Sequence, residues 1–171
     1  MSIRTIMIFP EFENIDVIND IRKKYDSLAD LVLPHITIVF PFDSKLTNDE
    51  LSLHLKMCLN DIQSFGIELE GFSKQENKHG NYLLLNVVQG IAAIKNIHDR
   101  LYKGELEQFD IGYDYAPHMT VGKVSSVGLL NKAFDDVNRC SCKFSAEVKK
   151  ISVEMIGKHE ESIIIIEHEL G

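Results

Sequence analysis

The chain lacks several features that would decide its class at once. None of its apolar runs approaches the length of a membrane span, although 44% of its 171 residues are hydrophobic. Residues 1–10 are too short and too broken an apolar stretch for a signal peptide and instead predict a first strand. With a charged fraction of 26%, the composition is that of one soluble globular domain.

Cysteine is also scarce. Cys58, Cys140 and Cys142 are an odd number, and the Cys140-Ser141-Cys142 segment has no second pair. A zinc site normally requires two ligand pairs, and no carboxylate or further histidine has a ligand-like spacing, so the sequence predicts no metal and no cofactor. A reducing cytoplasm is the simplest location for such a chain.

Basic residues are few as well. The chain has 18 Lys and Arg against 26 Asp and Glu, a net charge of −8. A protein that wraps duplex DNA needs a basic face, which this balance argues against. The expected partner is a small phosphorylated nucleotide or an RNA end, with no duplex DNA and no membrane; the oligomeric state stays open.

Two copies of one tetrapeptide stand out against this composition, Pro34-His35-Ile36-Thr37 and Pro117-His118-Met119-Thr120. Because the chain has only four Pro, four Thr and seven His, chance would give two such tetrads with odds of about one in 10⁵. Each leads into a β-prone stretch, and in a strand residues i and i+2 share one face. The histidine and the threonine of each tetrad therefore face the same way, and the two copies predict one symmetric site.

The rest of the chain predicts strands alternating with helices. Helices are expected at 14–26, 47–60, 91–102 and 126–138, and strands at 3–9, 35–40, 65–74, 82–87, 117–124, 143–156 and 162–167. Both halves run from a tetrad strand through a helix, an alternating strand and a hairpin to an apolar strand, and residues 65–69 resemble 144–148. The expected fold is therefore a single α+β domain over 1–171 made of two duplicated, pseudo-symmetric lobes. Each lobe would be an antiparallel sheet with outer helices, and the cleft between the lobes would hold the tetrads.

Paired histidines suit phosphoester chemistry, because imidazole can act as an acid or a base near neutral pH. One of His35 and His118 would remove a proton from the attacking water, and the other would protonate the departing oxygen. The hydroxyls of Thr37 and Thr120 would donate hydrogen bonds to phosphate oxygens as charge accumulates. The sequence does not assign acid and base to the two histidines.

Paired tetrads in duplicated lobes resemble the two-histidine phosphoesterases, also called the 2′-5′ RNA ligase-like superfamily. The similarity runs over nearly the whole chain, and a small bacterial subgroup is resembled most at Ile8-Phe9-Pro10, Arg22-Lys23-Lys24-Tyr25-Asp26, the first tetrad and Pro41-Phe42. The resemblance implies a metal-independent phosphoesterase acting on a cyclic phosphodiester of a nucleotide or an RNA end. It implies that His35 and His118 are the acid–base pair. It also implies that the two tetrad threonines bind phosphate.

Residues near the tetrads have two interpretations each. Many relatives carry an arginine three residues after the second threonine, where this chain has Lys123, which would contact phosphate or be an exposed strand charge. Tyr115 and Tyr113 would stack on a base or pack at the rim of the core. Arg22 is expected at a solvated helix end rather than in the cleft.

Two other functions fit the same residues. One is an RNA-end ligase or transesterase using the same site, which would need a longer binding surface than the acidic chain suggests. The other is a nucleotide- or RNA-binding regulator without turnover, although two intact tetrads argue for catalysis.

Overall fold

The computed structural model describes residues 2–171, and its strands form one eight-stranded sheet in which all neighbours are antiparallel. In spatial order the strands are β6 (Lys143–Val148), β3 (Phe65–Asn77), β4 (Gly80–Gln89), β5 (His118–Val124), β2 (Ile36–Asp43), β1 (Ile3–Ile8), β7 (Lys150–Ile156) and β8 (Ser162–Glu169). The helices are α1 (Ile15–Tyr25), α2 (Asn48–Leu59), α3 (Ile91–Leu101) and α4 (Val127–Val137), and a 3₁₀ helix, η1 (Gly104–Phe109), precedes β5. All four expected helices form.

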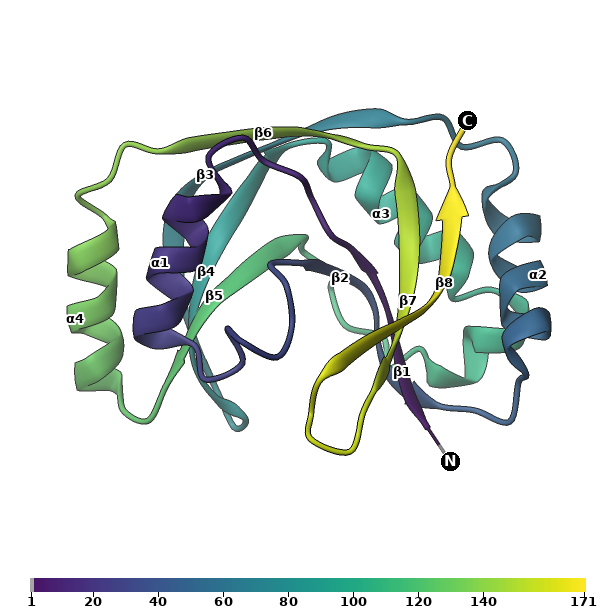
Figure 1. Cartoon of the computed structure of the whole chain (residues 1–171), viewed down its shortest axis with the longest axis horizontal. Coiled ribbons are helices and arrows are strands. Elements are labelled where there is room, and N and C mark those ends of the chain that lie inside the picture. Colours follow the sequence, from purple (N-terminus) through teal and green to yellow (C-terminus); the bar gives the residue numbers. More distant parts are fainter. Residues whose placement is uncertain (1) are drawn as a thin grey trace.

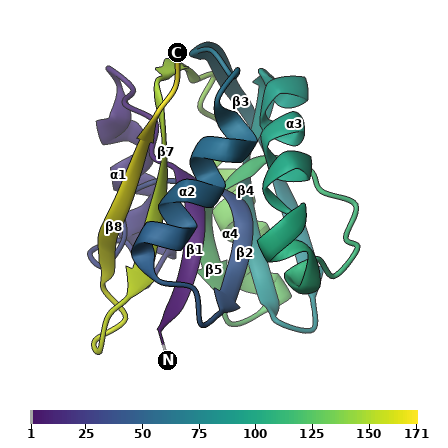
Figure 2. The ribbon, with the colours of Figure 1, turned by 90° about the vertical axis from the view of Figure 1, so that its right-hand side faces the viewer.

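The sheet is weakest at its centre. Within residues 2–171, β2 and β5 share a single ladder position, Ile36 with Met119, whereas β4 and β5 pair at six. The sheet therefore has two halves, β6-β3-β4-β5 and β2-β1-β7-β8. Helices α1 and α4 cover the first half and α2 and α3 the second (Figure 1), and Figure 2 looks onto α2 and α3. Two lobes with outer helices were expected, and here they are joined through one sheet.

The chain passes repeatedly between the halves. α1 follows β1 of one half but packs against β5 of the other, and α3 follows β4 but packs against β2. The order β1-α1-β2-α2-β3 recurs as β4-α3-β5-α4-β7, with β6 inserted before β7. β3 and β7 each occupy the third place outward from the central seam. This recurrence supports the duplication, which stays a prediction.

Two details of the expected repeat are wrong. The strand expected over 143–156 breaks at Lys149 into β6 and β7, which lie in opposite halves of the sheet. The similar segments 65–69 and 144–148 belong to β3 and β6, which pair directly with each other, Phe65 with Val148 and Leu69 with Phe144. Both segments alternate because they lie side by side over the same core, and they are not equivalent strands of two lobes.

Helices α1 and α3 bury the same pattern of side chains. Isoleucines recur with the same spacing, at 15, 18 and 21 in α1 and at 91, 94 and 97 in α3, and all but the exposed Ile91 contribute to the core. The residue after the third isoleucine is polar and buried in both helices: Arg22 is 1% exposed and His98 is 8% exposed. These two polar residues hold the same place after the third isoleucine, Arg22 in the helix that packs against β5 and His98 in the helix that packs against β2.

Several smaller expectations can be compared with the structure. Thr47 and Glu50 form the expected capping box at the start of α2. Within residues 2–171 no helix is long and apolar enough to cross a membrane. The sulfur atoms of Cys140 and Cys142 are in contact between α4 and β6, and Cys58 is a free thiol. The odd cysteine count therefore reflects one close pair and one single residue.

Candidate active site

The tetrad side chains lie on the two faces that strand alternation predicts. His35 directly precedes β2, and His118 is the first residue of β5. Ile36 and Met119, between the histidine and the threonine of each tetrad, are completely buried in the core. The histidines and threonines are half-buried. Alternation therefore turns all four polar side chains to the face opposite the core.

The register across the seam decides which of these side chains face one another. Ile36 pairs with Met119 in the antiparallel sense. Continuing this register by one residue in either direction places the histidine of each tetrad across from the threonine of the other. The two histidines are then diagonal neighbours on one face, a separation of about 7–8 Å in a regular ladder. This leaves room for a phosphate group between two imidazoles and two hydroxyls.

Both imidazoles are held in the same way. Nδ1 of His35 lies 2.7 Å from the carbonyl oxygen of Leu33, and Nδ1 of His118 lies 2.8 Å from that of Ala116. In each case the acceptor belongs to the residue before the tetrad proline, whose ring fixes φ and favours extended backbone just before it. Because a carbonyl only accepts, Nδ1 carries the proton in both rings. Nε2 is therefore the nitrogen that gains and loses a proton at both histidines.

The electrostatic surroundings of His35 favour its neutral form. Burial of the ring lowers the pKa of His35 below its usual 6.5, and the Arg22 guanidinium lowers it further. The hydrogen bond to Leu33 acts in the opposite direction, as do the negative charges of Glu154 and Asp26. Burial outweighs these contributions, so the free Nε2 of His35 can accept a proton at neutral pH.

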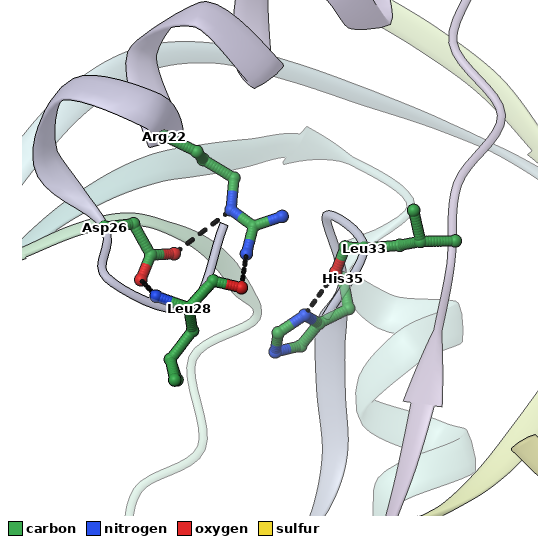
Figure 3. Close-up of polar contacts among 5 residues, drawn as sticks. All are labelled: Arg22, Asp26, Leu28, Leu33 and His35. Atoms are coloured by element: carbon green, nitrogen blue, oxygen red, sulfur yellow. Dashed lines mark hydrogen bonds and ion pairs between the residues drawn. The ribbon is translucent and has the colours of Figure 1, made fainter. Parts of the chain in front are cut away.

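Arg22 does not lie at a solvated helix end, contrary to the sequence-based expectation. Its Nε donates to Oδ2 of Asp26 at 3.1 Å, and Nη2 donates to the carbonyl oxygen of Leu28 at 3.4 Å (Figure 3). α1 ends at Tyr25, and the loop that follows brings the carbonyl of Leu28 to the buried guanidinium. The sequence signal was present but weak, because Arg22 follows the apolar stripe of α1 at the place that buried His98 has in α3.

Tyr115 and Lys123 are less suited to bind a substrate directly. Of the two interpretations of Tyr115 the structure shows the packed one: it is 7% exposed, and its ring stacks on His98 with centroids 3.8 Å apart. The Lys123 side chain is exposed, and its ammonium lies 5.4 Å from the centroid of the Tyr82 ring. Lys123 lies three residues beyond Thr120, about 10 Å further along the strand. Its contact with phosphate stays a prediction.

Three side chains outside the tetrads hold the backbone of β2. The Tyr115 hydroxyl donates to the carbonyl oxygen of Thr37 at 2.7 Å, and His98 Nδ1 bonds to that of Ile38 at 2.7 Å. The Tyr102 hydroxyl accepts from the backbone N–H of Phe40 at 3.0 Å. Here the ladder with β1 shifts register and β5 pairs at one residue, so these bonds replace missing ladder bonds. These three bonds fix the strand that displays Thr37. The sequence did not predict the bonds.

Known proteins are similar to this chain in sequence. The sequence profile of the 2′-5′ RNA ligase superfamily matches residues 9–157. A candidate phosphoesterase of Bacillus licheniformis is 27% identical over 121 residues, which cover 69% of this chain and 69% of that protein. Another, from Bacillus mycoides, is 29% identical over 123 residues, covering 69% of this chain and 67% of that protein.

Solved structures share the fold at low sequence identity. E. coli LigT complexed with 3′-AMP superposes with a TM-score of 0.64 at 14% identity, over 99% of this chain and 98% of that one. E. coli LigT complexed with ATP gives a TM-score of 0.62 at 13% identity, over 99% of this chain and 97% of that one. Nearly every residue of the chain therefore has a counterpart in the same architecture.

Proposed function

The chain belongs to the 2′-5′ RNA ligase superfamily, and from this premise we propose that it hydrolyses a cyclic phosphodiester of a nucleotide or an RNA end without a metal. The observation that carries the proposal is the pairing of Ile36 with Met119 between β2 and β5, a register that, if continued by one residue, would set each tetrad histidine across from the threonine of the other tetrad. The names of the Bacillus relatives support a phosphoesterase. E. coli LigT complexed with 3′-AMP, ATP or phosphate supports a small phosphorylated ligand.

In this proposal His35 is the general base and His118 the general acid. The lowered pKa of His35 keeps its Nε2 free of a proton at neutral pH, which is the state that a base needs. His118 then supplies the proton that the departing ribose oxygen needs. The hydrogen bonds of both Nδ1 atoms to carbonyls confine the proton transfers to Nε2 in each ring.

The reaction is a displacement at phosphorus. Nε2 of His35 takes a proton from water as the water oxygen bonds to phosphorus, and the bond from phosphorus to one ribose oxygen breaks. Nε2 of His118 gives its proton to that ribose oxygen, so the product is a ribose hydroxyl beside a phosphate monoester. The Thr37 and Thr120 hydroxyls donate to the non-bridging oxygens, where negative charge grows during attack.

The first test is hydrolysis of nucleoside 2′,3′-cyclic monophosphates in the presence of excess chelator. Wild type should turn over at least one of them, and His35→Gln and His118→Gln should each lose about 100- to 10,000-fold in rate. Full turnover in both variants would overturn the mechanism. Loss of wild-type turnover on adding chelator would overturn the metal-free reaction.

A diester with a 4-nitrophenolate leaving group tests the separate roles, because nitrophenolate leaves without being protonated. A 2′-deoxynucleoside 3′-(4-nitrophenyl) phosphate, which has no 2′-hydroxyl to attack phosphorus in place of water, should retain most of its turnover in His118→Gln and lose it in His35→Gln. The reverse pattern would exchange the two roles. Joining of RNA ends by the wild type would favour ligation, and nucleotide binding with no turnover on any substrate would favour a binding protein.

A further inference from the structure

Arg22 carries a buried positive charge that the acid–base steps above do not use. It is the largest of the fully buried side chains, at 1% exposure. Burying a guanidinium is unfavourable unless its charge and its N–H groups are matched by partners. Asp26, whose side chain is 9% exposed, supplies one partner. The presence of this buried cation beside His35, the proposed catalytic base, therefore calls for a functional explanation.

Protein groups bond to only part of the guanidinium, and its third nitrogen does not belong to the fully buried, unpartnered polar atoms of the described residues. Its Nε and Nη2 are directed to Asp26 and Leu28, and within residues 2–171 its Nη1 has no hydrogen-bond partner. Figure 3 shows this third nitrogen pointing away from Asp26, toward the side on which the His35 ring lies. The charge of Arg22 is also near enough to lower the pKa of His35. A donor with spare N–H groups thus faces the space beside the imidazole.

We propose that Arg22 binds the phosphate of the substrate, with Nη1 donating to a non-bridging oxygen beside His35. This inference rests on the proposed function of the tetrad site and adds to it a binding residue outside both tetrads. Guanidinium suits the role, because its planar fork of donors is always charged and matches the spacing of phosphate oxygens. The anionic phosphate completes the partner set that Asp26 leaves unfinished.

Asp26 holds this donor in place before the substrate arrives. While Oδ2 accepts from Arg22, Oδ1 accepts from the backbone N–H of Leu28 at 3.0 Å. The same carboxylate therefore fixes both the guanidinium and the loop that leads into the first tetrad. A donor fixed in advance loses little entropy when it binds phosphate. Lys123, by contrast, is exposed and lies over the Tyr82 ring.

The direct test compares Arg22→Lys with Arg100→Lys. Arg100 is the matched control because it also pairs with an aspartate, Asp61, but on the surface. Arg22→Lys should lower kcat/KM for a turned-over cyclic nucleotide and weaken inhibition by inorganic phosphate, each by about 10- to 150-fold, as for one charged hydrogen bond. Arg100→Lys should leave both unchanged. Equal behaviour of the two variants would overturn the proposal.

A rescue experiment separates phosphate binding from a structural role. Arg22→Ala with millimolar guanidinium ion should recover part of its lost turnover, whereas a variant that merely misfolds should not respond. The pH profile gives a second readout: losing the Arg22 charge raises the pKa of His35, so the acidic limb should move to higher pH. A folded Arg22→Ala that shows neither rescue nor a moved limb would contradict the proposal.

The wild type provides a readout that needs neither turnover nor a folded variant. The chain has four arginines, so ¹⁵N-arginine labelling gives a side-chain spectrum simple enough to follow Arg22. Adding inorganic phosphate should shift the Arg22 resonances and leave those of Arg100 in place. Unmoved Arg22 resonances would refute phosphate binding by this residue. If no substrate is turned over, the proposed hydrolysis fails, and this measurement still decides the role of Arg22.

Discussion

Tyr115→Phe tests whether the packing behind the site controls its geometry. The substitution removes one oxygen and leaves the ring, which stacks on His98 with an angle of 2° between the planes. What is lost is the hydrogen bond from the hydroxyl to the carbonyl oxygen of Thr37, 2.7 Å long. Burial raises the pKa of Tyr115, so the hydroxyl remains a donor throughout the range of an activity assay.

The expected loss of stability follows from that single bond. Loss of the partner of this partly buried carbonyl costs about 1–3 kcal/mol. In a chain of 171 residues each kcal/mol lowers Tm by about 2–4 °C, so Tm should fall by about 2–12 °C. Thr37 loses its anchor at the same time, and a displaced phosphate ligand should lower kcat/KM by up to about 100-fold.

The matched control lies two residues earlier in the chain. Tyr113 is 61% exposed and touches Phe40 edge-on, so Tyr113→Phe should leave Tm and turnover unchanged. Thermal unfolding and cyclic-nucleotide hydrolysis of both variants would be measured side by side. If Tyr115→Phe kept wild-type Tm and kcat/KM, or if Tyr113→Phe alone lost turnover, the hydroxyl would not anchor the first tetrad.

Three further outcomes are expected. Lys123→Ala should change kcat/KM less than twofold, because the Lys123 ammonium lies over the Tyr82 ring. The substitution removes a cation–π contact that contributes at most about 1 kcal/mol. A tenfold loss of kcat/KM would place Lys123 in the site. His35→Gln should make stability less sensitive to acid: the pKa of His35 is lowered in the folded state, so the unfolded chain binds the proton more readily and wild type loses stability as pH falls below 6.5. Equal slopes of unfolding free energy against pH would contradict this. Gly122→Ala should lose about 1–3 kcal/mol and bind phosphate more weakly, because its Cβ would lie 2.9 Å from the Tyr25 Cβ of α1. Gly128→Ala, with no atom nearer than 3.9 Å, should be neutral or stabilising, and similar unfolding curves for both glycine variants would refute the clash.

The sequence predicted the features that depend on local alternation and composition. Period-two alternation placed Ile36 and Met119 in the core and the tetrad histidines and threonines on the other face. The three- and four-residue spacing of isoleucines predicted α1 and α3, and Thr47 marked the start of α2 through its capping box.

Features that depend on which distant strands pair could not be predicted from the alternation of apolar and polar residues. Alternation is the same in strands of either half, so it could not show that β6 pairs with β3 while β7 pairs with β1. The environment of Arg22 was missed for a related reason. Arg22 begins the run Arg22-Lys23-Lys24, which is typical of a solvated helix end. Its place after the apolar stripe of α1 was only a weak signal of burial, and the contact of the guanidinium with the carbonyl of Leu28 depends on a loop whose path the pattern does not encode.

The corresponding positions of α1 and α3 serve different purposes, and this difference makes the surroundings of the two tetrads unequal. In α3 the position holds His98, whose ring bonds to the backbone of β2 and stacks on Tyr115, so it supports a tetrad strand from behind. In α1 it holds Arg22, which bonds to its own loop and places a charge near His35. The tetrads are alike in sequence and in their Nδ1 hydrogen bonds, so neither feature can distinguish an acid from a base. A cation beside one imidazole can, because it favours the neutral ring there. Arginine in place of His98 should therefore lower the pKa of a nearby imidazole only if the loop after α3 also turned back to hold the new guanidinium.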